Sequence, residues 1–399
     1  MLARIAALLL LSACGPATPD DVLDEVWSLV RTHFFDPALN GVDWDAARRR
    51  ARAQAGEAAL DAAIDGMLAE LGASHTKRFT RDDVAYHVLL ELFWDALEPE
   101  QRARVGGTGP PPLPGIGILT EEAEVGGERG SFVCTLLAGS PAEAAGLRVG
   151  DRLIAVEGEP FRPVASFRER VGRWVPLSVQ RSADPASVEV VQVRPEAVTA
   201  RAQFLRALRS SGKVLRRESK ALAYVQMVSY AGEELHEALR GKLLHGPLAE
   251  SDGLVLDLRG GFGGANPEYL ELFRRDLPAL VFRARDGEER APVASWTKPV
   301  VLLVDEGTTS GKEIFAHGFR RLGLGKIVGT RSAGAVLGAR LFVLSDGSVL
   351  YLAVQDVHVD GERLEGRGVE PDVLVPWSRP FSGGADPQLE AALATLARL

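Results

Sequence analysis

Five consecutive apolar residues, Val300–Val304, run directly into a segment rich in Gly, Thr and Ser. An uninterrupted apolar run of this length is typical of a strand covered on both faces, as in the parallel sheet of an α/β protein. From about residue 205 onward, similar strand-type runs alternate with segments of helical spacing. The strand-type runs are 221–227, 253–258 and 327–328, the helical segments are 233–244 and 267–277, and a hairpin pattern covers 341–354. We therefore expect an α/β layered domain that includes some antiparallel strands.

Ser310 stands where the strand Val300–Val304 has ended and the next helix is expected to begin. A hydroxyl at a helix start lies beside free backbone N–H groups and the positive end of the helix dipole, which favours an acyl-transfer nucleophile. Ser and Thr are also common helix caps. This segment alone leaves both interpretations open.

A glycine-rich segment at residues 257–264, with the sequence DLRGGFGG, follows another strand-type run. Backbone N–H groups in such a loop are suited to line an anion or oxyanion pocket, although a tight structural turn has the same composition. Asn266 stands where a dinucleotide-binding fingerprint needs its third glycine. We therefore expect no dinucleotide cofactor.

The N-terminus carries the pattern of a bacterial lipoprotein signal. Arg4 gives a positive start, residues 5–11 are apolar, and a small-residue stretch ends at Cys14. We expect Cys14 to become the lipid-bearing first residue of the mature chain and to hold it on a membrane surface. The alternative is an ordinary secretory signal that is cut near Ala13. Cys134 would then be alone, which excludes a disulfide within the mature chain.

Residues 21–102 are predicted to form an N-terminal helical domain after a signal and tether at 1–20. Apolar residues recur there at helical spacing, and Gly72 is placed to end the second helix. Ser74 and His75 follow immediately. A lone histidine beyond a helix end is usually a surface or capping residue.

Length and charge limit the possible organisation and partners. At 399 residues the chain is expected to hold two or three domains. Its formal net charge of -8 is spread along the chain, which argues against a nucleic acid as partner. The seven histidines include no His-Glu-x-x-His pair, so we expect no zinc site and no other metal or cofactor.

A Pro/Gly-rich linker at 103–114 leads into a predicted β-rich domain at 115–198. The segment 138–154, AGSPAEAAGLRVGDRLI, closely resembles a PDZ domain. In such a domain the start of the first strand offers backbone N–H groups to the terminal carboxylate of a peptide, and an exposed strand edge pairs with its backbone. A PDZ fold used only as a spacer or lid is the alternative. The expected carboxylate-binding residues are Gly115, Ile116, Gly117 and Ile118.

From about residue 26 to 376 the chain resembles the tail-specific and tricorn-type serine peptidases, which carry a PDZ domain inserted before a crotonase-like catalytic core. Besides the PDZ segment, the resemblance lies in 34–44, in Ser74-His75, in 305–315 and in 364–372. It implies a crotonase-like core at 199–399 with a C-terminal helix. It also implies that Ser310, three residues before Glu313, is the nucleophile.

The same resemblance separates two kinds of catalytic base. Tail-specific enzymes use a lysine about 25 residues after the serine, and Ala335 occupies that place here. Tricorn-type members use a histidine preceded by a serine, together with a glutamate, and these places are filled by Ser74, His75 and Glu365. The resemblance therefore implies a Ser-His-Ser-Glu tetrad, in which Glu365 orients His75 directly or through Ser74. The expected oxyanion donors are Gly311, Gly263 and Gly264.

Two residues depart from the family pattern. Gly261 stands where many relatives carry asparagine, and Lys312 stands where small or acidic residues are usual. Neither change removes a reacting group.

The function expected from these features is a lipid-anchored serine endopeptidase that hydrolyses peptides or unfolded protein tails through an acyl-enzyme. We expect it in a bacterial cell envelope, facing the periplasm, with an oligomeric state that the sequence leaves open. The alternative is a catalytically inactive peptide-binding or scaffold lipoprotein of the same fold. An α/β-hydrolase is disfavoured because Thr308, two residues before Ser310, replaces the glycine of a nucleophile elbow.

Overall fold

The computed structural model describes residues 18–54, 59–276, 278, 281–290 and 293–399. The sheet of the α/β core has six strands in the order β10-β11-β12-β15-β16-β21, all parallel except the edge strand β10. The bounds are β10 Lys213–Arg217, β11 Lys220–Gln226, β12 Gly253–Asp257, β15 Val300–Val304, β16 Lys326–Gly329 and β21 Val373–Leu374.

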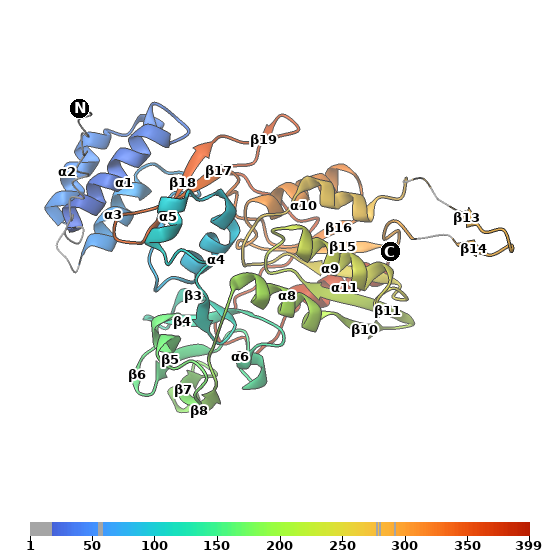
Figure 1. Cartoon of the computed structure of the whole chain (residues 1–399). Coiled ribbons are helices and arrows are strands. Elements are labelled where there is room, and N and C mark those ends of the chain that lie inside the picture. Colours follow the sequence, from blue (N-terminus) through green and yellow to red (C-terminus); the bar gives the residue numbers. More distant parts are fainter. Residues whose placement is uncertain (1–17, 55–58, 277, 279–280, 291–292) are drawn as a thin grey trace, which may run out of the picture.

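Helices cover both faces of this sheet (Figure 1). Val300, Leu302 and Val304 pack on one face with α8 Ala200–Ser211, α9 Glu233–Leu244 and α10 Gly311–Arg321. Val301 and Leu303 pack on the other face with α11 Pro387–Ala397. Each residue of β15 is thus buried on one side or the other, which explains its unbroken apolar sequence and confirms the expected α/β layering.

A second, three-stranded sheet lies between the core and the N-terminal helices. Its order is β1-β18-β17, with β1 Lys77–Phe79, β17 Gly338–Val343 and β18 Val349–Gln355. The helices α1 Pro19–His33, α2 Trp44–Gln54 and α3 Leu60–Ala69 pack against it in a shared apolar cluster. The antiparallel pairing of β17 with β18 confirms the predicted hairpin at 341–354.

The strand β1 corrects the expectation of a purely helical segment before residue 102. Three residues are too few to show a strand period, and β1 is ordered by pairing with β18, about 270 residues later. Arg78 on β1 is buried and contacts Asp61, Asp346 and Ser348, which fixes this strand between the helices and the hairpin.

A separate antiparallel sheet carries the PDZ-like segment (Figure 1). It comprises β3 Ile118–Val125, β4 Glu128–Leu136, β5 Arg152–Val156, β6 Glu159–Pro160, β7 Val175–Gln180 and β8 Val188–Val193, with the short helices α6 Pro141–Ala144 and α7 Ala165–Arg168. Its own apolar cluster includes Val133, Leu147 and Phe167. The strands β2 Leu113–Gly115 and β9 Glu196–Val198 pair where the chain enters and leaves it. The end of the expected linker is therefore a strand.

The remaining elements are short. The helix expected at 267–277 is a 3-10 helix that ends at Phe273, because Arg274 has extended backbone. These elements are η1 Leu39–Gly41, α4 Val84–Phe93, η2 Trp94–Ala96, α5 Pro99–Arg104, η3 Pro185–Ser187, η4 Pro267–Phe273, β13 Phe282–Arg283, β14 Glu289–Arg290, β19 His358–Val359 and β20 Glu362–Arg363.

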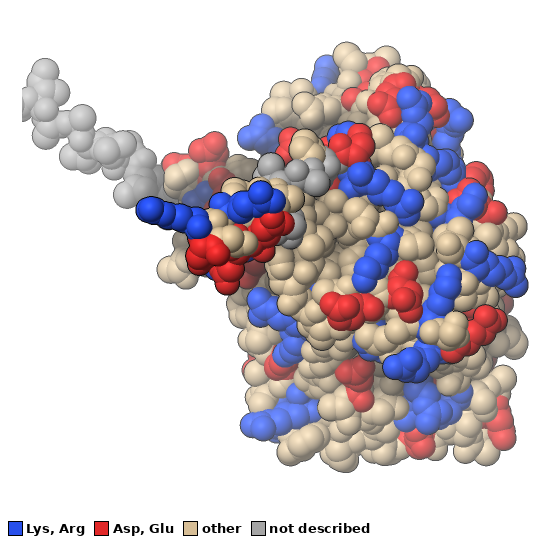
Figure 2. Space-filling view, turned by 90° about the vertical axis from the view of Figure 1, so that its right-hand side faces the viewer, with Lys and Arg blue, Asp and Glu red and all other residues tan. Residues whose placement is uncertain are grey.

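Two observations concern the surface and the membrane. Positive and negative side chains are interspersed over the face shown in Figure 2. In the part of the chain that the structure describes, no helix is both long and apolar enough to cross a bilayer.

Cys134 is a free thiol whose pKa is raised to about 12 by burial, whereas Cys14 lies outside the described residues.

Candidate active site

A cavity of about 580 Å³ brings together residues from widely separated parts of the sequence. Ser310, His75 and Ala335 line it, together with Gly263 and Gly264 of the glycine-rich loop. Most of the remaining lining is apolar and comes from β1, α4 and β18. The apolar residues from these three elements are Phe79, Ala85, Leu89, Leu92, Phe93 and Tyr351, and Ala73 and Phe262 add to the apolar lining.

Ser310 is the N-cap residue of α10 and has an unusual backbone, with φ 57° and ψ −129°. A non-glycine residue in such a conformation costs about 1–3 kcal/mol and persists only where its surroundings hold it. The Ser310 N–H donates to the Ala335 carbonyl at 2.8 Å and to Glu313 Oε2 at 3.1 Å. The strained turn thus places the serine on the cavity wall, at the N-terminal end of a helix.

Glu313 is the residue that fixes this turn. Its side chain is fully buried, and its carboxylate also accepts hydrogen bonds from Ser332 Oγ at 2.6 Å, Gly334 N at 2.7 Å and Ala335 N at 2.8 Å. Burial raises the pKa of Glu313, although these hydrogen bonds oppose the shift. Glu313 thus links α10 to the segment at 332–335, a role that its spacing from Ser310 in the sequence does not indicate.

Ser74, His75 and Glu365 form a connected chain of polar contacts. Ser74 Oγ lies 2.8 Å from Glu365 Oε2 and 3.0 Å from His75 Nδ1. The Ser74 N–H also donates to Glu365 Oε1 at 3.0 Å, and Val336 N donates to Glu365 Oε2 at 2.7 Å. The contacts of Glu365 therefore reach His75 through Ser74.

These contacts indicate which nitrogen of His75 carries a proton. A hydroxyl has one proton to donate, and an ionised carboxylate can only accept. If Ser74 donates to Glu365, its oxygen must accept from Nδ1–H of His75. Nε2 then keeps its lone pair.

His75 is held in a largely apolar setting. Its ring lies against Tyr351, with ring centroids 5.1 Å apart. Burial lowers the pKa of His75, and the Glu365 carboxylate partly opposes this. The imidazole is consequently neutral near pH 7. Tyr351 is not among the site residues expected from sequence, because its position on β18 is apolar in pattern and only pairing with β1 brings it to His75.

The glycine-rich loop approaches Ser310 so closely that side chains are excluded. A Cβ on Gly263 would lie 2.6 Å from Ser310 Cβ and 3.2 Å from the Gly311 amide nitrogen. Gly264 has φ +93°, and a Cβ there would lie 2.4 Å from the Ala231 Cβ. The backbone of the loop and the first residue of α10 therefore meet beside the serine. The oxyanion roles of Gly311, Gly263 and Gly264 remain predictions.

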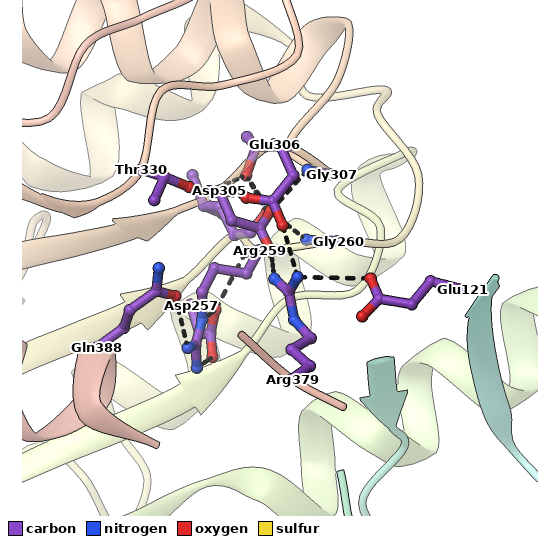
Figure 3. A network of polar contacts seen from close by, with 12 residues as sticks. Glu121, Asp257, Arg259, Gly260, Asp305, Glu306, Gly307, Thr330, Arg379 and Gln388 are labelled. Carbon is purple, nitrogen blue, oxygen red and sulfur yellow. Dashed lines mark hydrogen bonds and ion pairs between the residues drawn. The ribbon is translucent and has the colours of Figure 1, made fainter. Parts of the chain in front are cut away.

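A network of charged side chains joins the glycine-rich loop to the turn before Ser310 (Figure 3). Asp305 Oδ1 accepts from Gly260 N at 2.8 Å and from Gly307 N at 3.0 Å, which ties the glycine-rich loop to the turn before Ser310. Its other oxygen is paired with Arg379, which also contacts Glu306 at 2.5 Å. The network therefore fixes two loops that line the cavity.

Three family models match this chain. They are the tricorn protease C1 domain at 16–73, a PDZ domain at 132–181 and peptidase family S41 at 221–375. The match to peptidase family S41 covers the segment that carries Ser310 and Glu365. The chain is a serine peptidase with a mixed helix and strand core and a PDZ domain.

Similar proteins span most of this chain. A carboxyl-terminal-processing protease of Synechocystis is 26% identical over 410 residues, which cover 96% of this chain and 88% of that protein. The carboxy-terminal processing protease CtpB of Bacillus subtilis is 26% identical over 82% of this chain and 65% of its own length. Tricorn protease homolog 1 of Streptomyces coelicolor is 26% identical over 94% of this chain, which spans 34% of that protein.

Two solved structures share the fold of this chain. The photosystem II D1 C-terminal processing protease matches with a TM-score of 0.51 at 22% identity and covers 93% of this chain and 98% of its own. The tricorn protease matches with a TM-score of 0.55 at 18% identity and covers 95% of this chain and 36% of its own.

The remaining predicted sites of the peptidase lie elsewhere. Gly115, Ile116 and Gly117 are buried, and Ile118 begins β3, where it pairs with Leu136. Gly117 has φ +81° and approaches Ser140 so closely that a Cβ would lie 2.3 Å from the serine Cβ. Their role in binding a terminal carboxylate remains a prediction. Among the described residues, no group of three metal-binding side chains occurs.

Proposed function

We propose that this serine peptidase hydrolyses peptide bonds with Ser310 as nucleophile and His75 as general base. The observation that carries the proposal is the chain of contacts from Glu365 through Ser74 to His75, which ends on the same cavity wall as Ser310. His75 Nε2 takes the proton of Ser310 as its oxygen attacks the peptide carbonyl. His75 then gives that proton to the leaving amine.

Ser74 and Glu365 act on His75 in this scheme. The Glu365 carboxylate stabilises the imidazolium that forms during attack. Ser74, which contacts both Glu365 and His75 Nδ1, orients the His75 ring. The hydrogen bonds from Ser74 N and Val336 N hold Glu365 in place. Backbone N–H groups of Gly311 and of Gly263 or Gly264 stabilise the tetrahedral oxyanion, each contributing roughly 3–4 kcal/mol to the barrier reduction.

A serine–lysine dyad is the other mechanism to consider. Ala335 lines the cavity at the place where a dyad lysine is expected, and it has no basic group. Lys77 is the one lysine in the cavity lining; it lies over the Phe79 ring and 4.0 Å from Asp65. His75 remains the base that the geometry favours.

The substrates proposed are peptides and unfolded protein tails. The largely apolar cavity favours an apolar side chain next to the scissile bond. The PDZ domain supplies a second contact for longer chains, with Gly115–Ile118 as the proposed carboxylate-binding segment. A peptide with a free terminal carboxylate should bind more tightly than its amide in a titration; equal affinities would remove this segment from the proposal.

Labelling with a fluorophosphonate probe, which modifies activated serine hydroxyls, tests the nucleophile. The wild-type protein should be labelled and Ser310→Ala should not, while the exposed-turn control Ser345→Ala should be labelled normally. Folded wild-type protein that is neither labelled nor active on peptides would instead support an inactive scaffold of the same fold.

We also propose that Cys14 carries a lipid and holds the peptidase in a bacterial cell envelope, on a membrane surface facing the periplasm. The support is the sequence before Cys14. A Cys14→Ser variant should move from the membrane fraction to the soluble fraction or fail to mature. Sedimentation with membranes at high salt would contradict the anchor.

A further inference from the structure

Lys312 is a buried cation at a position where elementary electrostatics disfavours one. It is the second residue of α10, two residues after Ser310, and its side chain has no exposed surface. The N-terminal end of a helix repels positive charge, and burial removes the hydration of the ammonium. An apolar residue of similar length would satisfy the packing at lower cost, so the charge calls for a different explanation.

The contacts of Lys312 are with the backbone of the glycine-rich loop and its neighbour. Its Nζ donates to the Gly260 carbonyl at 2.5 Å and to the Val228 carbonyl at 3.2 Å. Within the described residues it forms no salt bridge with a carboxylate. The Val228 carbonyl also accepts a hydrogen bond from Phe262 N at 2.8 Å. Residues 260 and 262, the two ends of this turn, are therefore both connected to Lys312, the first directly and the second through the Val228 carbonyl.

The charged groups around Lys312 come from three elements. Asp257, the last residue of β12, and Asp305, which follows β15, attract the ammonium, but each is also paired with an arginine, Arg259 and Arg379 respectively (Figure 3). Glu306 is likewise bound to Arg379. On α10 itself, the Glu313 carboxylate faces Ser310 and the segment at 332–335, and His317 faces Asp360. Burial outweighs the attraction and lowers the pKa of Lys312 to about 8.

Lys312 is not placed to act as a base itself. It lines neither the cavity of Ser310 and His75 nor the neighbouring cavity between the core and the PDZ domain. Its hydrogen bonds point to the loop, whose Gly263 and Gly264 form part of the cavity wall. Its effect on the reaction must therefore pass through that loop.

We infer that Lys312 is a positioning residue whose ammonium holds the glycine-rich loop against Ser310, so that the loop N–H groups are aligned for the oxyanion. This inference rests on the proposed role of Ser310 and the loop. Charge-assisted hydrogen bonds are roughly twice as strong as neutral ones, so the charged lysine holds the carbonyl of Gly260 more firmly than a neutral amine would. The alignment should matter to the transition state and little to substrate binding.

Steady-state kinetics of Lys312→Met test this inference. The variant keeps the side-chain length and removes both hydrogen bonds and the charge. We expect kcat to fall on the order of 10- to 100-fold, because a misaligned oxyanion donor loses much of its effect, while KM changes less than about threefold. Lys242→Met is the matched control, because Lys242 also donates to a backbone carbonyl, that of Arg209 at 2.7 Å, between two helices away from the cavity.

The pH profile provides a second readout that needs no variant. The kcat of the wild type should decline as pH rises through about 8, because Lys312 loses its charge there. This alkaline limb should be absent in Lys312→Met, whereas the acid limb of His75 should remain in both proteins. If Lys312 were purely structural, Lys312→Met would lower the stability of the protein but would leave the alkaline limb in place.

Several outcomes would overturn the inference. They are a Lys312→Met enzyme with normal kcat, one with an unchanged alkaline limb, or a wild type without any alkaline limb. If Lys312→Met does not fold, as judged by circular dichroism, the presence or absence of the alkaline limb in the wild-type pH profile decides whether the inference stands. Failure of the proposed function is a separate result, since Ser310→Ala would then retain activity whatever Lys312 does.

Discussion

Ser310 and His75 share an uncommon backbone property, because both are non-glycine residues with positive φ, 57° and 53°. Such residues persist where neighbouring contacts hold them, and they cluster at functional sites. For Ser310 these contacts come from Glu313 and Ala335, and for His75 from the Ser74–Glu365 pair. The backbone conformation of Ser310 and of His75 therefore depends on contacts with other residues of the chain.

His75→Ala should lower kcat/KM on the order of a thousandfold or more, as loss of a general base to an alcohol nucleophile does. Glu365→Gln should lower kcat/KM by a smaller factor, because His75 remains in place. In the wild type, kcat/KM should rise with pH through a value below 6.5, because burial lowers the pKa of His75 and only the neutral imidazole accepts the proton.

Peptidase assays across pH 4 to 8 on the wild type and both variants would measure this. His236→Ala serves as the control, since burial also lowers the pKa of His236 but it lies outside the cavity lining. Near-normal kinetics for His75→Ala would rule out the tetrad.

At the scale of elements, the loop between β12 and η4 owes its shape to glycine. Gly260, Gly261 and Gly264 have positive φ, and the loop follows a strand that is buried on both faces. Gly261, which departs from the pattern that the family resemblance leads us to expect, has φ +69°, and a Cβ there would lie 2.0 Å from the Val228 carbonyl oxygen. The departure at residue 261 therefore has a steric reason in this chain.

Gly261→Ala should lower the free energy of unfolding by more than the roughly 1–3 kcal/mol of left-handed backbone strain alone, because the new Cβ also displaces the Val228 carbonyl. It should reduce kcat as well, since the loop moves away from Ser310. Urea denaturation and peptidase assays would measure both effects. Gly287→Ala is the control, with φ +88° but nothing within 4 Å of its Cβ position; an equal loss in the two variants would argue against the clash.

At the scale of the whole molecule, residues 379–384 join the PDZ domain to the catalytic core. Arg379 pairs with Asp305 and Glu306 of the core and lies 3.6 Å from Glu121 on β3. Phe381 packs edge-on against Phe132 of β4, with ring centroids 5.1 Å apart. The same Asp305 holds Gly260 and Gly307, so the PDZ contact and the active-site loops meet in one network.

Arg379→Met should destabilise the protein by about 3–5 kcal/mol, because it leaves the buried Asp305 carboxylate without its cation. Glu121→Gln removes only the partly exposed contact to the PDZ domain and should cost less than about 1 kcal/mol. Urea denaturation at pH 7 measures both. Equal losses would mean that the PDZ contact, rather than the pairing with Asp305, carries the stability of this junction.

Local pattern was enough to predict several elements. The strand Val300–Val304 and the helix Glu233–Leu244 have the bounds that periodicity gives, because each places its apolar residues at the spacing of a buried face. The turn that carries Ser310 follows from the end of one pattern and the start of the next. The sequence resemblance also singled out Ser74, His75 and Glu365, although their catalytic roles remain a proposal.

Only the tertiary structure decided how these parts meet. Strand β1 forms because β18 pairs with it, and Ser74 reaches Glu365 across 291 positions of sequence, a separation that no local pattern records. Tyr351 and Glu313 gain their roles from the same long-range packing. Lys312 is the clearest case, because only the fold buries it against the glycine-rich loop. Local periodicity determines which face of an element is apolar, whereas burial and hydrogen-bond partners depend on what the rest of the chain places against that face.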